Sequence, residues 1–313
     1  MSSFRSVSAR HEQYFSAEVA RIALEERGKA LASFRKELGT GQTRLLLSML
    51  TELLLALSHG ADRDMTDFGK WHLFAARTLI NKMLEDTSHP WNLNPLFRLY
   101  EQQELDAPGL SLAVQQVGHW HHPIYGSCTD LIFILGNLGR YCRQLLYSGH
   151  RSFTREAQLE KLLYLWNAPS TEPTLVLLYE SLRKHGLILL YRICGWNDTF
   201  TNPYLREISL EPLIHRYALE TVDHLLQIPA SSNYLNFQSL PILTAGSELR
   251  REDNKLRDDV RHRLRALYSV NRLPVNLHAL ELLEEIWAAR DTSDDMSSWI
   301  HHMHRKGWLL VLG

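Results

Sequence analysis

The chain has 313 residues, of which 45% are hydrophobic, so it is long enough and apolar enough to bury a substantial core. Its 34 basic and 35 acidic residues leave a formal net charge of -1, which excludes a chain drawn as a whole to nucleic-acid phosphates or to an anionic membrane. The 3 cysteines match neither a Cys-x-x-Cys metal motif nor an even disulfide framework, and this usage fits a reducing compartment.

The N-terminal residues, "MSSFRSVSARHEQYF", have no apolar core of the kind that a secretory signal needs, so we expect the protein not to be secreted. The most hydrophobic run begins at Arg44 and is interrupted by Ser48 and Glu52. This run is shorter than the roughly 20 apolar residues that span a bilayer, and it predicts a buried helix and no membrane partner. We expect residues 1–24 to form a partly flexible segment and residues 25–313 to form one domain.

Apolar residues recur with helical spacing along nearly the whole chain, whereas strict alternation over four to eight residues does not occur and β-branched residues are sparse. We therefore predict an all-α fold, a single irregular multi-helix domain of packed helical hairpins. Pro212 is expected to break one predicted helix, and Pro241 is expected to interrupt another. In chain order, the predicted helices cover 16–38, the Leu-rich run after Thr43, 66–84, 96–106, 129–147, 155–166, 172–194, 204–227, 234–270 and 276–289.

The predicted helix over 66–84 has one apolar stripe, which we expect to face the core. Aromatic side chains offer large areas to such a core, so we expect Trp71, Trp287 and Trp308 to be largely buried. The stripe consists of Trp71, Phe74, Ala75, Leu79 and Met83.

Two histidine clusters, "GHWHHPIYGSC" at 118–128 and "WIHHMHRKGW" at 299–308, suggest chemistry at first sight. Folded together, the histidines at 119–122 and 301–304 could supply ligands to a metal-dependent all-α enzyme, with Cys128 as a further ligand. The other interpretation is a polar connection before a helix, with Ser127 or Thr129 as N-cap and Asp130 in the first turn. We favour the connection, because His119 and His121 are two residues apart and Pro123 disfavours a helix at His122. The sequence therefore predicts no catalytic residue, metal ligand or cofactor.

The charged segments also favour a structural interpretation. The acidic pairs in "LRDDVRHRL" and "TSDDMSSW" lack the third acid that a bridged magnesium cluster needs, and Pro203 breaks the helix expected for "NDTFTNPYLRE". The segment "ELRREDNKLRDDVRHRLRAL" predicts a surface helix with two pairs on its solvated side, Asp253 with Arg257 and Asp259 with Arg263. Neither a nucleophile elbow nor a Gly-rich phosphate loop nor a His-Glu-x-x-His motif is present.

Segments at four places resemble, in order, the regulatory domain of fungal zinc-cluster transcription factors. They are "LLLSMLTELLLALSHG" with "WHLFAARTLI", then "HPIYGSCTDLIFILGNLGRYCRQ", then "LPILTAGSEL", and finally "ALELLEEIWAARD" with "WIHHMHRKGWLLVLG". The similarity runs from about residue 25 to the end. The residues that carry it are His72, Ala76, Tyr125, Gly126, Pro241, Gly246, Trp287 and Trp308.

This resemblance implies an all-α domain in the nucleus that regulates transcription, often of metabolic genes or of secondary-metabolism clusters. Without the resemblance, we would expect a cytoplasmic protein. It implies no enzyme, and it implies a co-regulator protein or a small-molecule effector as partner, with a homodimer left open. Family members carry an upstream module of six cysteines that holds two zinc ions and contacts DNA, and this sequence lacks that module. The chain is then either a fragment or a member that acts through partners. We also expect Gly126 to adopt a backbone conformation that a residue with a Cβ disfavours.

Overall fold

The computed structural model describes residues 17–39, 45–59, 70–85, 107–118, 127–170, 172–207, 209–271, 273–292 and 297–308. Regular structure throughout these ranges is helical, and none of them contains a strand, so the all-α prediction is confirmed. Contacts divide the chain into two compact units. Unit 1 comprises 1–103, 268–278 and 307–312, and unit 2 comprises 104–267, 279–306 and residue 313. The predicted division at residue 25 stays a prediction.

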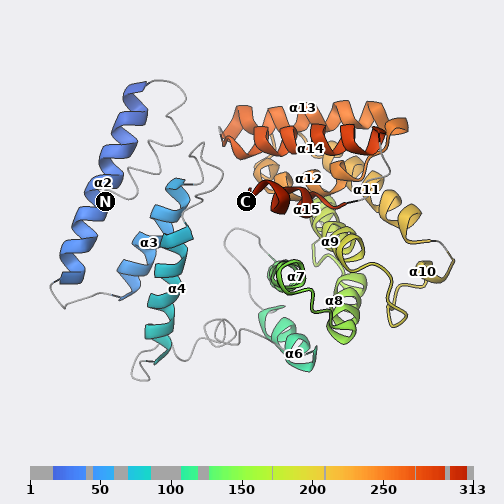
Figure 1. Cartoon of the computed structure of the whole chain (residues 1–313), viewed down its shortest axis with the longest axis horizontal. Coiled ribbons are helices and arrows are strands. Elements are labelled where there is room, and N and C mark those ends of the chain that lie inside the picture. Colours follow the sequence, from blue (N-terminus) through green and yellow to red (C-terminus); the bar gives the residue numbers. More distant parts are fainter. Residues whose placement is uncertain are drawn as a thin grey trace. The chain divides into compact units, whose positions relative to one another are not determined.

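Unit 1 contains helices α2 (Ala17–Gly39), α3 (Leu45–His59) and α4 (Lys70–Glu85). The remaining helices belong wholly or mainly to unit 2, and the α-helices among them are labelled in Figure 1. They are α6 (Ala107–Gly118), α7 (Thr129–Ser148), α8 (Phe153–Leu165), α9 (Pro173–Cys194), α10 (Tyr204–Glu207), α11 (Leu210–Gln227), the 3-10 helix η2 (Leu235–Gln238), α12 (Ser239–Ser247), the 3-10 helix η3 (Arg251–Asp253), α13 (Asn254–Asn271), α14 (Val275–Thr292) and α15 (Trp299–Lys306).

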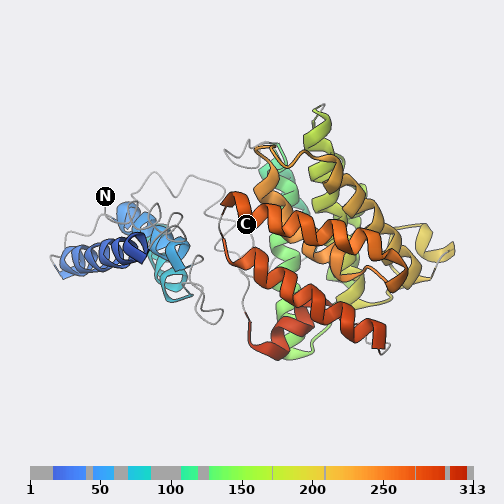
Figure 2. The same cartoon turned by 90° about the horizontal axis from the view of Figure 1, so that it is seen from above.

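Helix α9 is the central helix of unit 2. It packs against α7, α8, α11 and α12, and all its residues from 184 to 191 are buried. Helix α12 is buried as completely, because residues 241–247 are all inaccessible. Helices α13 and α14 run side by side in opposite directions (Figure 2). Unit 2 is therefore organised around two short buried segments, and any polar group on them needs an internal partner.

In unit 1, helices α3 and α4 pack on each other through a small apolar cluster. Met49 of α3 lies against Ala76, Leu79 and Met83 of α4, and each of these side chains is at most 8% exposed. The predicted stripe on α4 was therefore rotated from the true one. Trp71 is 72% exposed, so the prediction that it is buried was wrong.

The other two tryptophans follow the prediction more closely. Trp287 is 2% exposed, which confirms its predicted burial. Trp308 is half-buried, with its ring centroid 6.0 Å from that of His278. The size of an aromatic side chain thus does not predict its burial unless it is known which face of the helix it lies on.

The prolines lie inside helices, near their starts. Pro212 is the third residue of α11 and Pro241 is the third residue of α12. A first-turn N–H has no partner within its helix, so proline costs little there. The predicted helix over 204–227 is broken just before Leu210 and not at Pro212. The long segment predicted over 234–270 is interrupted after Ser247. The predicted helix over 96–106 lies outside the described residues, and α6 was not predicted.

No helix in the described ranges is both long and apolar enough to cross a membrane.

Gly246 on α12 gives a test of how tightly unit 2 is packed. A Cβ at this position would lie 3.1 Å from Leu283 Cδ1 and 3.2 Å from Val260 Cγ1, and both neighbours are fully buried. We expect Gly246→Ala to lower the free energy of unfolding by roughly 1–2 kcal/mol, as overpacking outweighs the gain in helix propensity. The measurement is urea denaturation followed by circular dichroism.

The matched control is Gly139→Ala on α7, where a new Cβ meets no heavy atom within 4 Å. This substitution should raise the free energy of unfolding by up to about 1 kcal/mol. Equal effects of the two substitutions would contradict the packing argument.

Candidate functional site

The candidate site is built around α12, where two of the sequence segments that carry the family resemblance meet. Trp287 Nε1 on α14 donates a hydrogen bond of 2.8 Å to the carbonyl oxygen of Gly246. Because Gly246 has no side chain, Leu283 of α14 can pack directly over it. Pro241 is buried one and a half turns earlier in α12. The structure thus brings Gly246 and Trp287 into contact, with Pro241 buried on the same helix as Gly246.

Two arginines of α13 flank the ring of Trp287. The guanidinium carbons of Arg257 and Arg261 lie 5.3 and 4.7 Å from its centroid, within the range of cation–π contacts. Arg257 also binds Asp291 at 2.7 Å, and Arg261 binds Glu284 at 2.6 Å. These contacts fasten α13 to α14 on both sides of the tryptophan.

Both predicted charge pairs on the solvated side of α13 are wrong. Arg257 is 3% exposed and pairs with Asp291, whereas Asp253 lies 2.8 Å from His215 Nε2. Arg263 is 8% exposed and donates to the carbonyl oxygens of Ile228 and Leu226, at the end of α11. The sequence spacing allowed local pairs, but tertiary partners capture these side chains.

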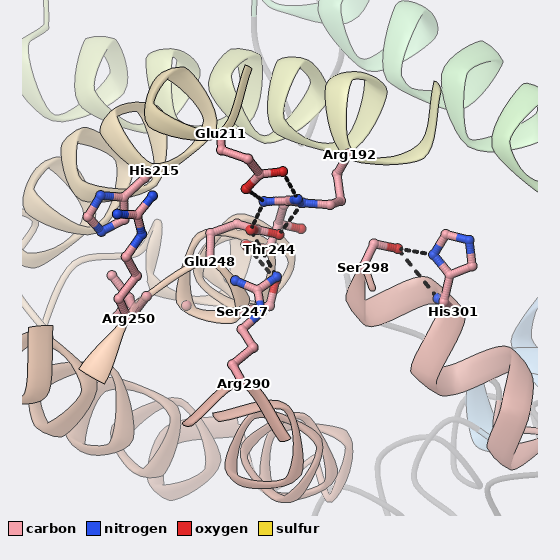
Figure 3. A network of polar contacts seen from close by, with 12 residues as sticks. Arg192, Glu211, His215, Thr244, Ser247, Glu248, Arg250, Arg290, Ser298 and His301 are labelled. Carbon is pink, nitrogen blue, oxygen red and sulfur yellow. Dashed lines mark hydrogen bonds and ion pairs between the residues drawn. The ribbon is translucent and has the colours of Figure 1, made fainter. Parts of the chain in front are cut away.

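A buried carboxylate, Glu248, joins three helices at the end of α12 (Figure 3). It is 3% exposed and accepts from Arg192 Nη2 of α9 at 2.6 Å and from Arg290 Nη2 of α14 at 3.0 Å. Arg192 also donates to Glu211 of α11, with Nη2 and Oε2 2.9 Å apart. Burial alone would lower the pKa of Arg192, but the neighbouring carboxylates outweigh it and raise that pKa. The two negative charges of Glu211 and Glu248 are therefore matched by the two positive charges of Arg192 and Arg290.

One turn earlier on α12, Thr244 Oγ1 lies 2.8 Å from His185 Nδ1 of α9. His185 is 3% exposed, and burial lowers its pKa to about 4. The imidazole is therefore neutral near pH 7. His185 and Arg192 of α9 therefore bind two positions one helical turn apart, Thr244 on α12 and Glu248 at its end.

Two further buried carboxylates, which the sequence analysis missed, hold the loop between α9 and α10. Glu156 accepts from the Tyr141 hydroxyl at 2.7 Å and from Asn197 Nδ2 at 3.3 Å. Glu160 accepts from the backbone N–H groups of Thr201 and Asn202 at 2.8 and 3.0 Å. The signal was present in "NDTFTNPYLRE", whose two asparagines are 3% and 1% exposed and fix the loop by amide hydrogen bonds.

Two histidines of the second cluster, His301 and His304, contact neighbouring side chains. His301 Nδ1 lies 3.0 Å from Ser298 Oγ, and the same oxygen accepts from the His301 N–H at 3.4 Å, which is the pattern of a helix cap. Ser298 is 1% exposed, so it is not accessible as a nucleophile. The His304 ring lies 5.2 Å from that of Tyr147. Within the described ranges, no group of three or more His, Cys, Asp or Glu side chains could hold a metal ion.

The first cluster, His119 to His122, and the motif residues Tyr125 and Gly126 lie outside the described residues, so the predictions for them stay predictions. The predicted N-cap of the following helix was wrong. Cys128 occupies that position, and its side chain does not cap the helix. Asp130 does lie in the first turn, where it accepts from Trp166 Nε1 at 2.9 Å.

The cysteines are not reactive candidates. All three are buried, and burial raises the pKa of Cys128 and Cys142 to about 12. Both thiols are therefore protonated near pH 7 and are poor nucleophiles.

In unit 1, the motif residues His72 and Ala76 face α3. His72 Nδ1 lies 2.6 Å from Glu52 Oε2, and Glu52 is 4% exposed. Ala76 is 2% exposed in the cluster with Met49. These residues, like those of α12, join helices rather than line a reactive centre.

Comparison with known proteins gives one finding. A family model described as the fungal specific transcription factor domain matches residues 87–313, which is well over half of the chain. No curated protein and no solved structure matches the chain.

Replacing the central carboxylate tests the buried network. Glu248→Gln keeps the size of the side chain but leaves Arg290 without an opposing charge, so we expect the free energy of unfolding to fall by about 3–5 kcal/mol. The control is Glu252→Gln, whose carboxylate is exposed and lies 3.7 Å from Arg250, and which should change stability by less than about 0.5 kcal/mol. Chemical denaturation measures both, and a small effect at Glu248 would show that the network does not stabilise the fold.

His185 should make stability depend on pH. Its pKa is about 4 in the folded protein and about 6.5 in the unfolded chain, so between these values the unfolded state binds more protons. The contribution is therefore complete above pH 6.5 and decreases as the pH falls toward 4, by a total on the order of 3 kcal/mol. We expect His185→Gln to flatten this part of the stability profile, measured by urea unfolding from pH 4 to 7.

The exposed His150 provides the comparison for this profile. His150→Gln should leave the pH dependence of the parent unchanged. If His185→Gln also left it unchanged, burial of a neutral His185 would not be its source.

Proposed function

The chain belongs to the fungal specific transcription factor domain family and has a role in transcription regulation, and on this premise we propose that it acts as a regulatory domain through a bound partner. The observation that carries the proposal is the family match over residues 87–313, supported by the meeting of Gly246 and Trp287 in the core. The partner is a co-regulator protein or a small-molecule effector.

The chemistry of the described residues supports binding rather than catalysis. The buried acids Glu156, Glu160 and Glu248 are each matched by hydrogen-bond donors from other helices or loops. Such groups are fully used in holding the fold. A domain of this kind is a rigid scaffold that presents a surface to a partner.

Contact with DNA requires a separate module in this proposal. The sequence has 3 cysteines, too few for the six-cysteine zinc cluster of the family, and its net charge of -1 gives no overall attraction to phosphate. We therefore place DNA binding on another segment or on a partner chain. A nuclear location and target genes in metabolism or secondary metabolism complete the proposal.

Transcript profiling tests the proposed function. Deletion of the gene should change a restricted set of transcripts, and a tagged full chain that restores them should accumulate in the nucleus. An unchanged transcript profile under conditions in which the gene is expressed would contradict a regulatory role. Exclusion of the functional tagged chain from the nucleus would contradict the proposed location.

A further inference from the structure

We draw no further inference here: the strongest candidate, the solvent-exposed aromatic surface patch of Phe153 and Trp196 beside the connection between α7 and α8, carries nothing because no feature of the described residues shows what covers it.

Discussion

The architecture of unit 2 depends on the burial of polar groups on α12. Residues 241–247 of this helix are all buried, yet it carries Thr244 and is followed directly by Glu248, which is buried as well. Each must be satisfied by a neighbouring helix, since an unpaired buried polar group costs several kcal/mol. His185 and Arg192 of α9 and Arg290 of α14 meet this need, so the position of α12 determines the positions of both neighbours. Apolar packing gives the unit its stability, and these polar contacts select one arrangement.

The helices themselves were largely predictable, because the apolar period of 3.6 residues is a local signal. The bounds of α9, predicted over 172–194, agree with the structure to within one residue. The errors arose where tertiary context decides. The first turn of a helix tolerates proline, so Pro212 and Pro241 did not mark breaks. On α4 the choice of the buried face depended on α3, which sequence periodicity does not specify.

The candidate site was less predictable than the fold, for a physical reason. Similarity to a family pointed to Gly246 and Trp287, but it did not say that they touch. Their hydrogen bond joins residues far apart in the sequence, and neither residue alone suggests it. The converse error occurred at Arg257, where a favourable local spacing with Asp253 was overridden by Asp291 on the neighbouring helix. Packing of α13 against α14 sets which acid the Arg257 side chain reaches.

Core and surface are coupled at Glu156, which is completely buried yet determines the surface. Its oxygens bind Arg151, whose guanidinium packs on the exposed Phe153 ring and donates to the Trp196 carbonyl. A buried charge is costly unless fully bonded, and here one of the bonding partners, Arg151, is a residue that solvent can reach. The same interactions that satisfy the core therefore fix the geometry of the exposed aromatic side chains. A surface fixed in this way differs from a mobile loop with the same residues, because its shape is maintained by the stability of the core.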